Sequence, residues 1–191
     1  VSPKNSLLLS PCYSEYENEL SKLDGTIHHY KLTEEKNFKI DVKEIIDYIN
    51  ENKIELFVFA NPNNPTGTIL NVEEIEEILQ NTNTKILIDE TYVEFTNTLV
   101  YSSIPLTKKY KNLFVTRGVS KFFASPGIRL GYGITSDEKT KEIFYKNSML
   151  WNITIFSDIM GRYMFDDTSY QNTVYNFIRE ERDYATSELS K

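Results

Sequence analysis

Four side chains that can do chemistry come shortly after the ends of apolar runs in the sequence: Asn64, Asp89, Tyr92 and Lys121. A neutral lysine amine can attack a carbonyl carbon, and a carboxylate can move a proton or stabilise a cation. Amide and phenol groups can hydrogen-bond a bound ligand. If the runs are neighbouring strands of one sheet, all four side chains meet at the same rim.

Each of these residues also has an ordinary interpretation by itself. The segment Asn64–Gly67 is a good turn sequence, because proline presets φ and glycine supplies positive φ. Asp89 fits a helix cap after a strand, and Lys121 fits a solvated surface lysine. Tyr92 is one of 13 tyrosines, most of which must pack in the fold. The order and spacing of the four residues therefore carry more information than any one of them.

The surrounding sequence alternates between short apolar runs and helical patterns. Asp41 caps a segment with apolar residues at helical spacing, and Asn71 with Glu74 forms a capping box that opens another helix. Further helices are predicted over Asp137–Ser148 and Tyr170–Lys191. The predicted strands are Leu7–Leu9, Thr26–Leu32, Leu56–Ala60, Lys85–Ile88, Asn112–Thr116 and Arg129–Ile134.

This alternation predicts an α/β fold with a predominantly parallel sheet, because a parallel crossover needs a dozen or more residues, usually a helix. The central runs are continuously apolar, as expected of strands that helices cover on both faces. In such sheets, ligands bind beyond the carboxyl ends of the strands. The prediction therefore places the four side chains at the ligand-binding rim.

Composition excludes several classes of protein. The formal net charge is −7 and no basic run occurs, which argues against a general binder of nucleic acid or of anionic membranes. No apolar stretch of about 18 residues and no recognisable secretion signal is present. The single cysteine, Cys12, excludes an internal disulfide framework. We predict a cytoplasmic protein without a metal site, in which Cys12 is a buried, unreactive thiol and His28 and His29 are packing or surface residues.

Taken together, the motifs resemble the fold-type I aminotransferases, which are pyridoxal-phosphate enzymes. The resemblance rests on Asn61–Gly67, on Asp89–Tyr92, and on Ser120–Lys121 with Arg129 eight residues after the lysine. It extends over nearly the whole chain. Within this family the sequence is most similar to the histidinol-phosphate aminotransferases and the threonine-phosphate decarboxylases, and Pro11–Glu17 looks most like the decarboxylase branch.

The resemblance implies catalytic roles for Lys121, Asp89 and Tyr92. Lys121 would form a Schiff base with the aldehyde of pyridoxal 5'-phosphate and then move the proton at the substrate Cα. Asp89 would face the pyridine nitrogen and keep it protonated, so that the ring can accept electrons. Tyr92 and Asn64 would hydrogen-bond the phenolic oxygen of the cofactor.

Other implied contacts hold the cofactor in place. Arg129 and the Ser120 hydroxyl would bind its phosphate, and Tyr13 would stack on its ring face. The implied substrate is a small amino acid or amino-phosphate, and both amino transfer and α-decarboxylation stay open. The alternative is a non-catalytic, truncated domain that keeps the same fold.

The resemblance also predicts that the chain is a fragment of a homodimeric protein. Family members carry an early phosphate-binding loop and a late substrate-binding arginine, and neither lies within these 191 residues. Residues 1–150 are expected to form the large cofactor-binding domain without its first strand. Residues 151–191 are expected to form interdomain helices and the helical start of a smaller domain. The missing strand would leave an open sheet edge near Arg129–Ile134.

Overall fold

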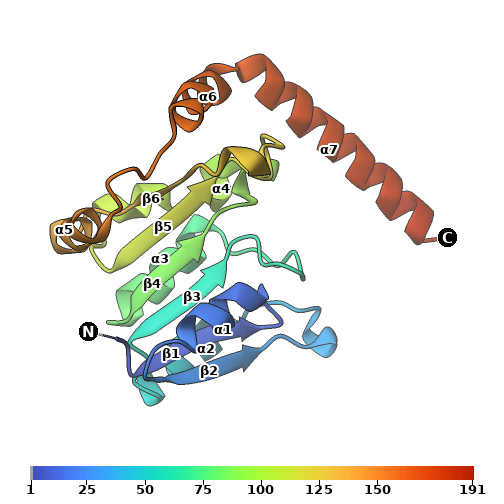
Figure 1. The fold of residues 1–191 in the computed structure, drawn as a ribbon. Coiled ribbons are helices and arrows are strands. Elements are labelled where there is room, and N and C mark those ends of the chain that lie inside the picture. Colours follow the sequence, from blue (N-terminus) through green and yellow to red (C-terminus); the bar gives the residue numbers. More distant parts are fainter. Residues whose placement is uncertain (1) are drawn as a thin grey trace.

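One six-stranded sheet organises the computed structural model, which describes residues 2–191 (Figure 1). The strand order is β2-β1-β3-β4-β5-β6. The first five strands along the chain pair in parallel, and β6 pairs antiparallel with β5. The strands are β1 (Asn5–Ser10), β2 (Thr26–Lys31), β3 (Leu56–Ala60), β4 (Lys85–Asp89), β5 (Leu113–Gly118) and β6 (Gly131–Ile134).

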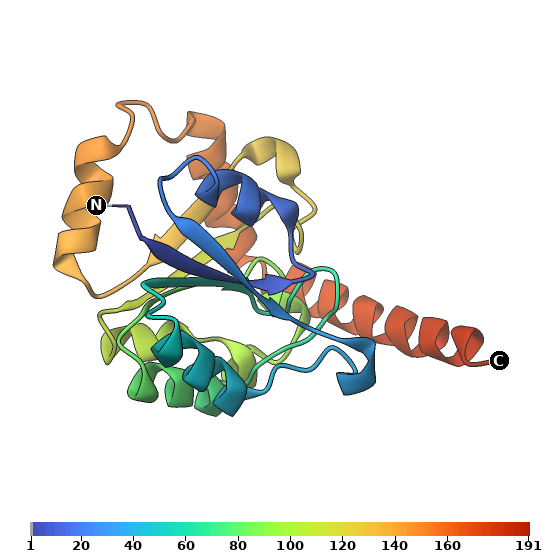
Figure 2. The ribbon, with the colours of Figure 1, turned by 90° about the horizontal axis from the view of Figure 1, so that it is seen from below.

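Helices cover both faces of this sheet (Figure 2). On one face lie α2, α3 and α4, and on the other lie α1 and α5. The α-helices are α1 (Ser14–Leu20), α2 (Val42–Glu51), α3 (Val72–Asn81), α4 (Thr98–Tyr101), α5 (Glu138–Asn147), α6 (Ile155–Asp166) and α7 (Thr168–Leu189). Short 3-10 turns are η1 (Glu34–Lys36), η2 (Val93–Phe95), η3 (Ile104–Lys108) and η4 (Pro126–Ile128). The predicted fold class is confirmed.

The predicted helix starts of α2, α3 and α5 are formed by side-chain caps. The Asp41 carboxylate accepts from the Glu44 N–H at 3.1 Å. In the capping box of α3, the Asn71 side chain accepts from the Glu74 N–H at 2.9 Å, and the Glu74 carboxylate accepts from the Asn71 N–H at 2.7 Å. Asp137 caps α5 in the same way. These bonds satisfy amide groups that the first turn of a helix leaves without partners.

The main core lies between the sheet and the pair α2 and α3. Side chains that alternate along the central strands point to this face, and isoleucines at helical spacing meet them from the two helices. All members are buried, and their apolar area supplies most of the stabilisation of the sheet. They include Leu7, Leu9, Phe57, Phe59, Ile86, Ile88, Ile45, Ile49, Ile75 and Ile78.

A second, smaller hydrophobic cluster supports the loop that follows β5. Val119, Phe122 and Phe123 are buried there, and they pack against residues of α6 and α7, including Met164 and Tyr170. The Tyr170 hydroxyl donates to the Phe122 carbonyl at 3.1 Å. Beyond these contacts, α7 extends away from the sheet (Figures 1 and 2) and has no buried residue. The small cluster therefore joins the loop after β5 to the last two helices.

The structure differs from the sequence prediction in several elements. The short helix α1 is missing from the prediction, which places no element between Leu7–Leu9 and Thr26–Leu32, and the predicted strand Arg129–Ile134 begins only at Gly131, because Arg129 has left-handed backbone geometry. The last strand does not follow the parallel pattern, because the segment between β5 and β6 contains the short turn η4 and no crossover helix. The predicted open edge is present, since β6 is the last strand of the sheet among residues 2–191.

We expect the substitution Phe123→Ala to lower the free energy of unfolding by about 3 kcal/mol, because it removes a buried ring from the small cluster. The Phe123 ring lies edge-on to Phe165 at 5.4 Å and stacked on Tyr170 at 6.0 Å. Urea unfolding followed by circular dichroism measures the change. The control is Phe177→Ala on the exposed side of α7, expected within about 0.5 kcal/mol of the parent. Equal losses in both variants would contradict the packing role of the cluster.

Candidate functional site at the carboxyl ends of the strands

Every residue predicted for the site lines one pocket of about 320 Å³ at the carboxyl ends of the strands. The parallel register explains the convergence, because Ala60 pairs with Asp89 and Asp89 pairs with Thr116. Segments that follow these strands therefore emerge side by side. The predicted residues are Tyr13, Asn64, Asp89, Tyr92, Ser120, Lys121 and Arg129; the further lining residues are Tyr16, Ala60, Thr91 and Pro126.

The Asp89 carboxylate is held by three hydrogen bonds. Its Oδ1 accepts from the Thr91 N–H at 2.9 Å and from the Thr91 hydroxyl at 2.5 Å. Its Oδ2 accepts from the Tyr16 hydroxyl at 2.7 Å. These donors come from two different elements, the turn after β4 and the helix α1. The carboxylate is therefore fixed in orientation at the floor of the pocket.

The sequence analysis missed both residues that hold Asp89, and of Thr91 and Tyr16 the one more distant in sequence is Tyr16. It lies on α1, and its ring stands edge-on to that of Tyr13 with centroids 5.6 Å apart. Burial and the neighbouring Asp89 carboxylate raise the pKa of the Tyr16 phenol, so the phenol stays protonated and donates to the carboxylate. Tyr13, Tyr16 and Leu20 follow helical spacing directly after a strand, which indicates the helix α1 but not the bond from Tyr16 to Asp89.

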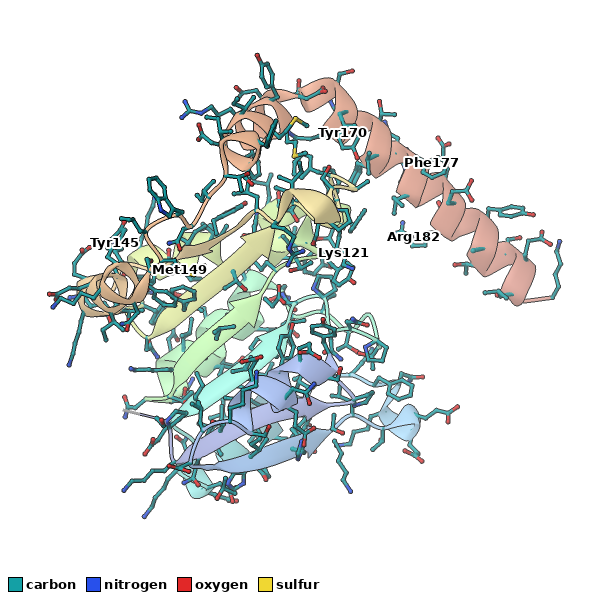
Figure 3. The ribbon with its side chains drawn as sticks, viewed as in Figure 1. Lys121, Tyr145, Met149, Tyr170, Phe177 and Arg182 are labelled. Atoms are coloured by element: carbon teal, nitrogen blue, oxygen red, sulfur yellow. The ribbon has the colours of Figure 1, made fainter. Side chains whose placement is uncertain are left out.

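Lys121 and Arg129 stand at opposite ends of the loop that joins β5 to β6. Lys121 lies beyond the end of β5, where Figure 3 labels it. Arg129 has a φ of 54° and Ala124 a φ of 48°, both in the left-handed region. Each costs a residue other than glycine about 1 kcal/mol, and such positions collect at functional sites. One Arg129 nitrogen donates to the Pro126 carbonyl at 3.0 Å, which folds this side chain back over the loop.

The segment that carries Asn64 is fixed from its neighbours. The fully buried Asn61 side chain donates to the Leu70 carbonyl at 2.9 Å and accepts from the Leu70 N–H at 2.8 Å. Asn63 donates to the Thr66 hydroxyl at 2.8 Å. Gly67 has a φ of 70°, which the turn prediction required of a glycine at this position. The segment is thus a turn and also part of the pocket wall.

A buried ion pair lies directly behind Asp89. The Glu90 carboxylate is fully buried and accepts from Arg117 at 2.8 and 3.0 Å, from the Ser102 hydroxyl at 3.0 Å, and from Ser103 at 2.5 and 2.6 Å. The hydrogen bonds to Glu90 and its electrostatic attraction raise the pKa of Arg117 despite the opposing effect of burial, so this cation stays charged. The pair connects the end of β4 to the end of β5.

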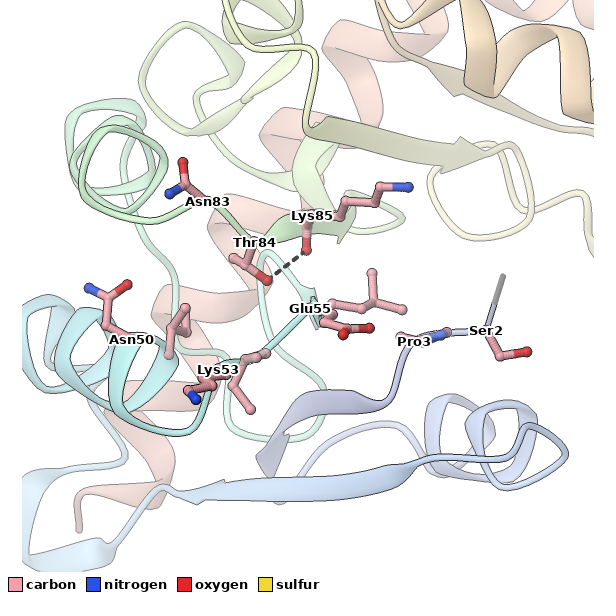
Figure 4. Close-up of a pocket in the computed structure, with 11 residues that line it drawn as sticks. Ser2, Pro3, Asn50, Lys53, Glu55, Asn83, Thr84 and Lys85 are labelled. Atoms are coloured by element: carbon pink, nitrogen blue, oxygen red, sulfur yellow. Dashed lines mark hydrogen bonds between the residues drawn. The ribbon is translucent and has the colours of Figure 1, made fainter.

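A larger hollow of about 720 Å³ lies at the opposite end of the sheet (Figure 4). It is lined by residues at or before the amino ends of the strands, among them Pro3, Lys53 and Lys85. Figure 4 shows the two lysine side chains extending in different directions. The nearby Glu55 carboxylate is engaged by the Lys4 N–H at 2.8 Å. This hollow lacks a convergent set of charged groups, and we assign the candidate site to the other end.

Cys12, His28 and His29 do not line the candidate site. Burial, with a smaller contribution from the Glu17 charge, raises the pKa of the Cys12 thiol, so this thiol is protonated at neutral pH. His28 Nδ1 lies 3.3 Å from the Tyr48 hydroxyl. Within residues 2–191, His, Cys, Asp and Glu side chains nowhere gather in threes as a metal ion would need. In the same part of the chain no helix is both long and apolar enough to cross a bilayer.

Comparison with known proteins adds to this geometry. The sequence profile of the family described as aminotransferase class I and II matches residues 4–191. The chain belongs to this family. The chain is 37% identical over 191 aligned residues to a protein of Caldanaerobacter subterraneus that is provisionally named threonine-phosphate decarboxylase, and the match covers 97% of this chain and 49% of that protein. The predicted resemblance is confirmed.

Two solved structures show a similar fold. The histidinol-phosphate aminotransferase of Clostridium acetobutylicum is 32% identical, with a TM-score of 0.91 over 98% of this chain and 56% of that one. The histidinol-phosphate aminotransferase of Sinorhizobium meliloti, in complex with pyridoxal-5'-phosphate, is 19% identical with a TM-score of 0.84, over 96% and 50% of the two chains. The chain therefore spans about half the length of the aminotransferases it matches.

We expect Arg117→Ala to destabilise the fold by about 3–5 kcal/mol, because it leaves the Glu90 carboxylate buried without its counter-ion. The free energy of unfolding is measured by urea titration. The control is Arg162→Ala, which removes an exposed pair with Asp158 on α6 and should cost less than about 1 kcal/mol. A loss at Arg117 no larger than at Arg162 would contradict a structural role of the buried pair.

Proposed function

We propose that the pocket binds pyridoxal 5'-phosphate and that the chain is the cofactor-binding part of an enzyme acting on a small amino acid or amino-phosphate. One observation carries the proposal: Lys121, Asp89 and Arg129, three charged groups of different chemistry, face the same pocket together with Asn64 and Tyr92. The pocket volume of about 320 Å³ lies within the range of small-ligand sites.

The donor set fits this cofactor group by group. Arg129 and Ser120 offer a cation and a hydroxyl to a phosphate, and the fixed Asp89 carboxylate offers an acceptor to a protonated ring nitrogen. Tyr13 presents an aromatic face at the mouth of the pocket, where 46% of its surface is exposed. Asn64 and Tyr92 supply hydrogen bonds to a ring oxygen between these ends.

When bound, the cofactor supplies an electron sink that stabilises negative charge at the substrate Cα. The residues of this chain bind, orient and move protons. Lys121 would hold the cofactor through its amine and would move a proton at the substrate Cα. Asp89 would stabilise positive charge on the ring nitrogen, which would keep the electron sink effective.

The names of the relatives favour a phosphorylated substrate, as in a threonine-phosphate decarboxylase or a histidinol-phosphate aminotransferase. The alternative is a truncated domain that keeps the fold without turnover. The chain spans about half the length of these relatives. Turnover of L-threonine phosphate or histidinol phosphate by the cofactor-loaded chain distinguishes an enzyme from a domain without turnover.

We retain the domain division at residue 150 and the cytoplasmic location as predictions.

The cofactor proposal is tested by titrating the purified chain with pyridoxal 5'-phosphate. The bound cofactor should absorb near the edge of the visible range, and borohydride reduction with peptide mapping should place the label on Lys121. The substitution Lys121→Ala should abolish the band, whereas Lys109→Ala, at a lysine paired with Glu76 outside the pocket, should not. A label on another lysine, or no spectral change well above micromolar cofactor, would refute the proposal.

We also propose that the protein assembles as a homodimer. The support is a run of exposed apolar side chains before and at the start of α6, among them Leu150, Trp151 and Phe156, which are 86, 84 and 73% exposed. Contiguous exposed apolar side chains mark surfaces at which proteins contact one another. Size-exclusion chromatography with light scattering should give twice the chain mass. A strict monomer at all concentrations would count against this assembly.

A further inference from the structure

The Asp89 carboxylate offers few free positions to a ligand. A carboxylate has about four acceptor positions, two on each oxygen. The Thr91 N–H and hydroxyl occupy those of Oδ1, and the Tyr16 hydroxyl occupies one on Oδ2. One acceptor position therefore remains, and it is on Oδ2. The two residues that donate to the Asp89 carboxylate come from different segments: Thr91 lies in the turn after β4 and Tyr16 lies on α1.

We propose that Tyr16 and Thr91 are positioning residues for cofactor binding, which turn Asp89 so that a single acceptor position, on Oδ2, meets the ring nitrogen. This inference rests on the proposed function. The contact between Asp89 and the ring is directed by donors from two segments, α1 and the turn after β4. Neither Tyr16 nor Thr91 needs to touch the ring in order to act.

The Tyr16 hydroxyl also lowers the negative charge on Asp89 Oδ2, the oxygen that would accept from the ring nitrogen. A hydrogen bond donated to a carboxylate spreads its negative charge onto the donor. Removing this donor leaves more negative charge on Oδ2 and also frees the carboxylate to turn. Two consequences follow: weaker binding of the cofactor, from lost orientation, and a proton held more tightly between Asp89 and the ring nitrogen, from increased charge.

The first experiment is a double-mutant cycle on cofactor affinity with Tyr16→Phe and Asp89→Ala, read from the absorbance of the bound cofactor. Tyr16→Phe is expected to weaken affinity about tenfold, the effect of losing one hydrogen bond to a charged group. In the Asp89→Ala background the same change should alter affinity less than about twofold, because Tyr16 acts through Asp89. Additive effects would refute the positioning role.

A matched control separates this effect from the general loss of a phenol. The Tyr30 hydroxyl donates to the Glu44 carboxylate at 2.6 Å, outside the pocket. Tyr30→Phe should leave cofactor affinity unchanged. Thr91→Val, which removes one of the two Thr91 donors, should weaken affinity about threefold, and Thr91→Ser should restore it. Equal affinities of Tyr16→Phe and Tyr30→Phe would overturn the inference.

The second experiment reads the proton itself. Nitrogen-15 NMR of ring-labelled pyridoxal 5'-phosphate follows protonation of the ring nitrogen against pH. In Tyr16→Phe the shared proton should be lost at a higher pH than in the parent, and a purely structural role would leave this pH unchanged. This pH measurement also tests the positioning role of Tyr16 if the Asp89→Ala variant binds the cofactor too weakly for its affinity to be measured. If the parent chain takes no cofactor at Lys121, the proposed function fails; if it does and Tyr16→Phe is unchanged in both readouts, only the present inference fails.

Discussion

The register of β3, β4 and β5 is the constraint on which the candidate site depends. Beyond the paired residues, the ladder continues into the loops: the Asn61 N–H donates to the Asp89 carbonyl and the Glu90 N–H donates to the Thr116 carbonyl, each at 2.9 Å. Successive side chains of a strand point to opposite faces. Asp89 therefore faces the pocket, whereas Glu90 points into the buried network with Arg117. A slip of one residue would exchange these two carboxylates.

The buried pair opposes such a slip. Glu90 is fully buried, and Asp89 in its place would be too short to keep the same contacts with Arg117 and the serines. Breaking a buried pair is costly, although forming one contributes little net stability, and fixing register is the best-attested use of such groups. The Glu90 pair therefore disfavours the slipped register, and it keeps Asp89 on the pocket face of β4, where Thr91 and Tyr16 hold its carboxylate.

Periodicity and capping chemistry were sufficient to predict most of the fold. Leu56–Ala60 was predicted to the residue, and Asp41 and Asn71 cap the helices that they were predicted to begin. These features are local, so the sequence states them directly. The convergence of the seven site residues followed from strand order and family motifs together. The antiparallel pairing of β6 depends on how the loop after Lys121 turns back along β5, a tertiary property that spacing does not encode.

Tyr16 shows why the rest could not be predicted. Its partner lies 73 residues later, and β3 separates β1 from β4 in the sheet. No local pattern marks a bond that crosses a strand.

The two sides of the pocket are supported by different hydrophobic clusters. The Lys121 side packs on the small cluster with α6 and α7, whereas Asp89 packs on the main core. The distance between the Lys121 amine and the Asp89 carboxylate therefore depends on both hydrophobic clusters. The Tyr16 hydrogen bond fixes the carboxylate on the side of the main core. A rearrangement of α6 and α7 would therefore displace the Lys121 amine and leave the Asp89 carboxylate in place.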